Sequence, residues 1–74
     1  MTHPIVLKTK EDIVKLSAEA AKADAGFTIS YGSIIVDPRS VLALLTLLGK
    51  TALLVAPDHM RPELFTSFIK KISE

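Results

Sequence analysis

Apolar and polar residues alternate with the period of a β-strand in some stretches of the chain and recur with helical spacing in others. The first stretch, residues 4–8, predicts a short strand. In this strand Ile5 and Leu7 would face a core, while Val6 and Lys8 would face the other side, because successive side chains of a strand point in opposite directions. The chain therefore begins with one strand of a sheet that has a buried and an open face.

Clean alternation on both sides of Gly32 is typical of a β-hairpin. The turn takes two residues, and the first of them needs a positive φ, which glycine adopts without steric cost. Such a turn pairs Tyr31 with Ile34 and, further along, Ile29 with Val36. The continuous apolar face of this hairpin would consist of Phe27, Ile29, Tyr31, Ile34 and Val36.

Three segments carry apolar residues at helical spacing. The first follows Thr9, a capping residue, and is expected to stop at Gly26. The second takes Asp37 as its cap, has a proline in its first turn and reaches about Leu48. The third opens at Pro62. These segments predict three helices.

Residues 51–56 are a further apolar run, too short for an ordinary helix and suited to a buried strand. This strand would complete a sheet of four and give the element order βαββαβα, an α+β fold in a single domain spanning residues 1–74. The same order also fits a ferredoxin-like ligand-binding or regulatory domain, which would have the sheet order 4-1-3-2.

The composition narrows the classes of function. Hydrophobic residues make up 49% of the chain, and cysteine is absent, so packing alone must hold the fold, which favours a reducing compartment such as the cytoplasm. A net charge of +1 without a basic run argues against nucleic acid as a partner. The longest apolar stretch, residues 41–48, is too short to cross a membrane.

Residues able to act as acid, base or ligand are few, and no motif surrounds them. His3 and His59 stand apart, and no close group of Cys, His and acidic residues predicts a metal site or a bound cofactor. Because His59 has no orienting partner nearby, we interpret it as a solvated loop histidine rather than a general acid or base. Ser30, Ser33 and Ser40 lack a local base that would activate them. The sequence thus predicts no catalytic residues and no enzyme activity.

The element order, the hairpin around Gly32 and the segment from Arg39 to Leu42 together resemble HPr, the histidine-containing phosphocarrier of the sugar phosphotransferase system. The resemblance covers almost the whole chain and is clearest from Ile13 to Gly49. It implies an open-faced sandwich, in which a four-stranded antiparallel sheet of order 1-4-2-3 carries three helices on one face.

The chain departs from that family where the phosphate is carried. HPr keeps a Gly-x-His-x-Arg-Pro type motif after its first strand, and here Thr9 stands near the histidine position and Glu11 near the arginine position. A threonine does not form the phosphoramidate of a reversible relay, and an acid repels a phosphoryl group. His3 lies at the wrong end of the first strand to substitute. We therefore expect a non-catalytic HPr-like interaction or regulatory domain; the alternative is a genuine phosphocarrier with an atypical acceptor, such as His59 or Ser40.

The second predicted helix carries the candidate sites. Its apolar residues point in almost every direction, more than one side of a sheet can bury, so part of that surface should be exposed. The resemblance places the partner-binding patch at Val41, Leu42 and Leu45, and makes Ser40 a candidate phosphorylation site. We expect a protein partner, or self-association, at this patch. A second candidate surface is the helix-free face of the sheet, represented by Val6, Ile35 and Leu54.

Overall fold

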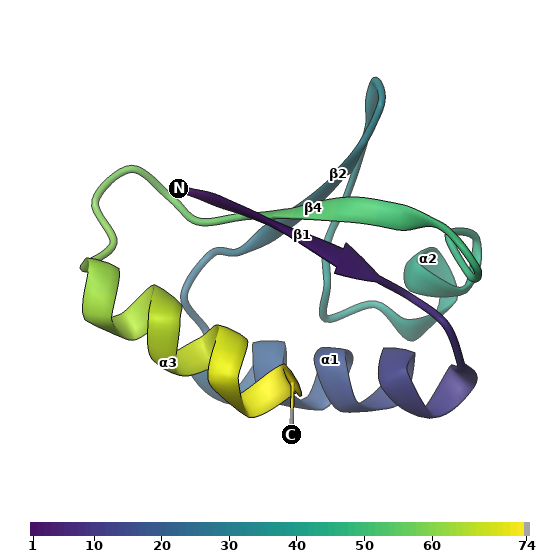
Figure 1. The fold of residues 1–74 in the computed structure, drawn as a ribbon, viewed down its shortest axis with the longest axis horizontal. Helices are drawn as coiled ribbons and strands as arrows, with labels where there is room; N and C mark the ends of the chain where they lie inside the picture. The colour runs from purple at the N-terminus through teal and green to yellow at the C-terminus, as the bar shows by residue number, and fades with distance from the viewer. Residues whose placement is uncertain (74) are drawn as a thin grey trace.

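The structure, a computed structural model that describes residues 1–73, contains the predicted order of strands and helices. The strands are β1 (Thr2–Val6), β2 (Thr28–Tyr31), β3 (Ile34–Val36) and β4 (Thr51–Val55). The helices are α1 (Lys10–Ala23), α2 (Val41–Leu45) and α3 (Pro62–Ser73). The sheet is antiparallel throughout, its order is β1-β4-β2-β3, and the helices lie on one face (Figure 1). The α+β class and the 1-4-2-3 order are confirmed, and the 4-1-3-2 order of the ferredoxin-like alternative is excluded.

The core lies between the sheet and the helices, and it is closed at one end by aromatic side chains. Phe27, directly before β2, stacks on Phe68 of α3 with ring centroids 4.2 Å apart, and the ring centroid of Phe65 of α3 lies 6.1 Å from that of Phe27. Aromatic pairs at these separations add to the burial of apolar area that holds α3 on the sheet. The largest side chains that are buried completely are those of Ile13, Ile29, Leu44, Leu54 and Pro38.

The faces predicted for the first strand and the register predicted for the hairpin are confirmed, but the first strand covers Thr2–Val6 instead of residues 4–8. Ile5 and Leu7 face the core, and Val6 lies on the other face with 48% of its surface exposed. In the hairpin Tyr31 pairs with Ile34, as the alternation predicts. Gly32 has a φ of +59° and supplies the positive dihedral that the first turn residue needs.

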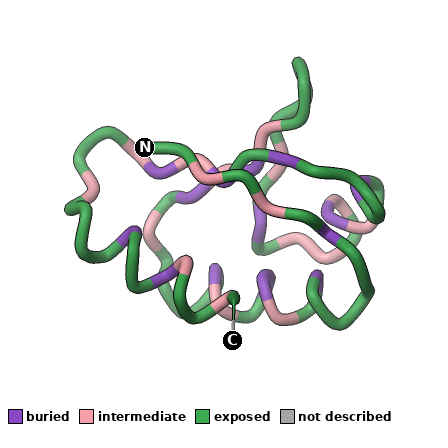
Figure 2. The backbone as a smooth tube through the Cα atoms, viewed as in Figure 1, coloured by how far each residue is buried: buried purple, intermediate pink, exposed green. Residues whose placement is uncertain are grey.

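The apolar face of the hairpin is only partly covered. Ile29 at its base is buried, but Tyr31 and Ile34 at its tip are 36% and 51% exposed. The hairpin extends beyond the body of the domain, and its end is coloured as exposed in Figure 2. The ammonium group of Lys50 lies 5.6 Å from the centre of the Tyr31 ring, a cation–π contact. The predicted face is therefore continuous in register, but its outer end does not reach the core.

Helix α1 begins where the sequence predicts and ends earlier. Thr9 is its N-cap, and Thr9 and Asp12 form a reciprocal capping box. At the other end the helix stops at Asp24, which adopts a left-handed conformation with φ +44°, so the stop predicted at Gly26 is displaced by two residues. Asn and Asp are the residues other than glycine that adopt this conformation most readily.

The prediction for the second helix was wrong at both ends. Asp37 is not its cap; Ser40 is, and α2 covers only Val41–Leu45. Beyond α2 the chain continues in turns, in which backbone amides of Thr46, Leu47 and Leu48 each bond to a carbonyl three residues back. With helices of 14, 5 and 12 residues, no helix of the described chain is long and apolar enough to cross a membrane.

The placement of Leu54 on the helix-free face was also wrong. Leu54 is completely buried, and it lies opposite His3 of β1 and Ile29 of β2, which face the helices as well. Since side chains alternate along β4, its neighbour Leu53 takes the open face, with 42% of its surface exposed. The open face is therefore represented by Val6, Ile35 and Leu53.

Candidate interaction surface on the α2 helix

The connection that leads into α2 is held by an ion pair within it. The carboxylate of Asp37 accepts hydrogen bonds from the backbone N–H of Arg39 at 2.9 Å, from its Nε at 3.1 Å and from its Nη2 at 2.8 Å. These bonds lower the pKa of Asp37, and the same carboxylate raises the pKa of Arg39. Asp37 therefore caps the turn that leads to Ser40, whose backbone N–H bonds to the Asp37 carbonyl oxygen at 3.0 Å, and does not cap α2.

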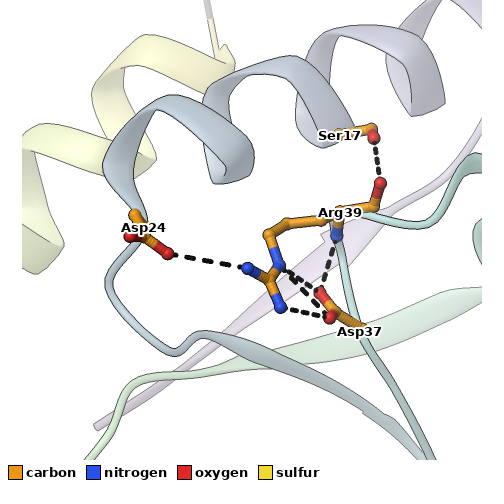
Figure 3. Close-up of polar contacts among 4 residues, drawn as sticks. All are labelled: Ser17, Asp24, Asp37 and Arg39. Atoms are coloured by element: carbon orange, nitrogen blue, oxygen red, sulfur yellow. Dashed lines mark hydrogen bonds and ion pairs between the residues drawn. The ribbon is translucent and has the colours of Figure 1, made fainter.

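Two contacts fix this connection on α1 (Figure 3). The hydroxyl of Ser17 donates to the carbonyl oxygen of Arg39 at 2.8 Å, and Nη1 of Arg39 lies 3.5 Å from Oδ1 of Asp24 at the end of α1. Ser17 is 8% exposed, so its bond is shielded from water, whereas the Arg39–Asp24 pair is exposed and contributes less. Sequence reasoning missed the role of Ser17, because 22 residues separate it from its partner.

Ser40 has a structural role at the start of α2. Its hydroxyl accepts a hydrogen bond from the backbone N–H of Ala43 at 3.3 Å, and its carbonyl accepts from Leu44 at 3.1 Å. The side chain is partly buried, with part of it open to solvent. This is an N-cap, a position that serine favours on its own account. Phosphorylation of Ser40 stays a prediction.

The three residues of the predicted patch, which we call the α2 surface (Val41, Leu42 and Leu45), differ in exposure. Leu42 is 80% exposed, the highest value among the large apolar residues of the described chain. Val41 and Leu45 are partly buried and pack against the core. Leu48, which sequence reasoning did not place in the patch, is 39% exposed one turn after Leu45. The excess of leucines did signal exposed apolar area, but not which residues would provide it.

The inward side of the same segment explains this division. Leu44 is completely buried and Leu47 is 2% exposed, so these two residues anchor α2 and the turns after it. Leu42 lies two residues before Leu44, on nearly the opposite side of the helix, and therefore points to solvent. In the α2 surface, Leu42 thus points to solvent, while Val41 and Leu45 beside it pack against the core.

At the start of α1, where the family resemblance places the phosphoacceptor, the side chains bond to the backbone. The hydroxyl of Thr9 accepts from the N–H of Asp12 at 3.1 Å, and Oδ2 of Asp12 accepts from the N–H of Thr9 at 3.3 Å. Glu11 lies in the first turn and is exposed. Carboxylates are favourable at the positive end of a helix. Glu11 and Asp12 are the acidic residues in the first turn of α1.

The two histidines differ in position. His3 is in β1 and lines a hollow of about 250 Å³ together with Asp12 of the first turn of α1, whereas His59 is exposed in the connection between β4 and α3. Among residues 1–73, no three His, Cys, Asp or Glu side chains are grouped as a metal site requires. Of the two histidines, His3 thus shares a hollow with the first turn of α1, and His59 lies in a separate connection.

A groove of about 530 Å³ opens beside the ion pairs of Arg39, between the end of α1 and the segment from β3 to α2. Phe27 and Pro38 are among its apolar lining residues, and Asp24, Asp37 and Arg39 supply its charges. These three charged groups pair with one another. The groove consequently lies where two segments of the fold meet, and its charged side chains form ion pairs with one another.

Comparison of the chain with models of protein families, with curated proteins and with solved structures finds no match. What the chain does is therefore argued from its own geometry.

Proposed function

We propose that this chain is a non-catalytic, HPr-like interaction domain that binds a protein partner through the α2 surface and does not relay phosphate. The observation that carries the proposal is the 80% exposure of Leu42 between two apolar neighbours that are partly buried. Burial of a leucine side chain stabilises a complex by about 1.5–3 kcal/mol. An apolar residue in this position gains free energy only when another molecule covers it.

The surroundings of Leu42 favour binding in a second way. Val41 and Leu45 already pack against the core, so their rotamers are restricted before any partner arrives. Side chains that are ordered in advance lose little conformational entropy on association. Leu42 is then the main apolar side chain of the surface that must be immobilised.

The proposed absence of phosphate relay is supported by the start of α1. Thr9 and Asp12 cap the helix through each other, and Glu11 adds a further carboxylate in the same turn. A phosphoryl group there would meet acidic side chains instead of a guanidinium group, and it would compete for backbone amides that Thr9 already engages.

The test compares affinity capture with the wild-type chain, the variant Leu42→Glu and the variant Leu64→Glu. Leu64 is a matched control because it is the same residue type, 57% exposed, on α3. We expect a partner retained by wild type and Leu64→Glu and lost with Leu42→Glu. The purified partner should then bind at least tenfold more weakly to Leu42→Glu in calorimetry, which corresponds to loss of about 1.4 kcal/mol. Equal binding to all three chains would contradict the proposal.

Incubation with enzyme I of the phosphotransferase system and phosphoenolpyruvate, followed by intact mass measurement, separates this proposal from the phosphocarrier alternative. We expect no added phosphoryl group. A phosphoryl group on His59 or on any other residue would establish the alternative instead.

A further inference from the structure

Ser17 is the one buried residue of the described chain that is polar or charged, with 8% of its surface exposed. It lies on the inner face of α1, where the other buried residues, Ile13, Leu16 and Ala20, are apolar. A buried hydroxyl costs free energy unless it is hydrogen-bonded, and alanine is the better helix former. A serine at this position therefore needs a compensating contact, which its bond to the Arg39 carbonyl provides.

The carbonyl of Arg39 depends on Ser17 in turn. In residues 1–73 no backbone N–H bonds to this carbonyl oxygen, and the Ser17 hydroxyl donates to it at 2.8 Å in a partly buried position (Figure 3). The ion pairs of the Arg39 side chain with Asp24 and Asp37 are exposed, so water and salt weaken them. Ser17 therefore supplies the shielded polar contact between α1 and the connection that leads into α2.

Helix α2 depends on tertiary contacts for its position. It has five residues, and isolated helices of this length are not stable in water. Beyond its far end Leu47 is buried, and the N–H of Gly49 bonds to the carbonyl oxygen of Leu7 at 2.6 Å. Its near end begins after Ser40, the residue that follows the carbonyl held by Ser17. Separate contacts thus hold the two ends of α2, and Ser17 holds the near one.

We propose that Ser17 is a positioning residue for the α2 surface, because its hydroxyl fixes the place at which α2 begins and thereby the direction in which Leu42 points. Leu42 is the second residue of α2, three residues after the Arg39 carbonyl. Without the hydroxyl, this partly buried carbonyl regains a hydrogen bond by turning toward water, which displaces the start of α2. The inference rests on the proposed function, since the direction of Leu42 matters to a partner that covers it.

Hydrogen exchange of backbone amides in the purified chain tests the role of Ser17 without a partner. In Ser17→Ala the N–H of Leu44, which bonds to the Ser40 carbonyl, should exchange about fivefold faster, the change in equilibrium that loss of one hydrogen bond produces. Amides of β4 should change only by the loss of global stability measured in urea. Ser73→Ala is the matched control, because it removes a hydroxyl–carbonyl bond of the same 2.8 Å length in α3, and it should leave the exchange of Leu44 unchanged.

The variant Arg39→Gln separates the carbonyl of Arg39 from its side chain. This variant loses the ion pairs with Asp24 and Asp37 but keeps the backbone carbonyl, so the exchange of Leu44 should rise less than in Ser17→Ala. A larger rise in Arg39→Gln would overturn the proposal, since the ion pairs would then hold α2. Equal rises at Leu44 and in β4 for Ser17→Ala would also overturn it, because Ser17 would then act on overall stability alone.

Affinity for the partner shows whether the position of α2 matters for binding. The partner retained by the wild-type chain should bind Ser17→Ala about fivefold more weakly although Leu42 is intact, and it should bind Ser73→Ala as it binds wild type. Unchanged affinity for Ser17→Ala would refute the positioning role. If Leu42→Glu loses no partner, the proposed function fails, and the exchange of Leu44 still decides whether Ser17 positions α2.

Discussion

The two adjacent leucines of β4 should respond very differently to truncation. Leu54 is completely buried between sheet and helices, whereas Leu53 lies on the open face and is 42% exposed. Replacing a buried leucine by alanine loses its transfer free energy and leaves a cavity, so Leu54→Ala should lower the free energy of unfolding by about 2–5 kcal/mol. The whole domain, at 74 residues, is expected to be stable by only about 4–11 kcal/mol. Leu54→Ala should therefore remove a large part of the total stability.

The effect of Leu53→Ala follows from its exposure. Slightly more than half of its surface is covered, alanine keeps part of that contact, and no cavity forms on a face that is open to water. The expected loss is about 1 kcal/mol. Urea denaturation followed by circular dichroism measures the free energy of unfolding of both variants. Equal losses for the two variants, or a larger loss for Leu53→Ala, would refute the assignment of faces in β4.

Two further predictions concern the start of α1 and the charges beside α2. Thr9→Ala should lower the free energy of unfolding by about 1 kcal/mol, which corresponds to a fall of about 4–8 °C in Tm. Thr9→Ser keeps the capping oxygen and should keep most of the stability, and an unchanged Tm for Thr9→Ala would contradict the capping role. Because the pKa of Asp37 is lowered in the folded chain, its pair with Arg39 stabilises the fold above the ordinary pKa of an aspartate, and this contribution disappears as the pH falls through the lowered value. NMR titration of the Asp37 carboxyl carbon should show a pKa closer to the ordinary value of an aspartate in Arg39→Gln than in the wild-type chain. The same pKa in the wild-type chain and in Arg39→Gln would exclude the ion pair.

The turn and the register of the hairpin were predicted correctly because their signals are local. Gly32 supplies the positive φ, and the alternation on both sides sets the register that pairs Ile29 with Val36. In β4 the strand itself was predicted, but the face of Leu54 was not, since residues 51–56 are apolar or small at almost every position and contain no clear alternation. Which of its residues point inward depends on the pairing with β1 and β2, which only the folded chain provides.

The start of α2 shows a different limit of sequence reasoning. An aspartate followed by a proline is a strong helix-start signal, but here Pro38 is completely buried and Asp37 binds Arg39. Ser17, far away in the sequence, holds the carbonyl of Arg39 and fixes the connection on α1. Because of these tertiary contacts, α2 begins after Ser40, the next residue whose side chain can cap a helix.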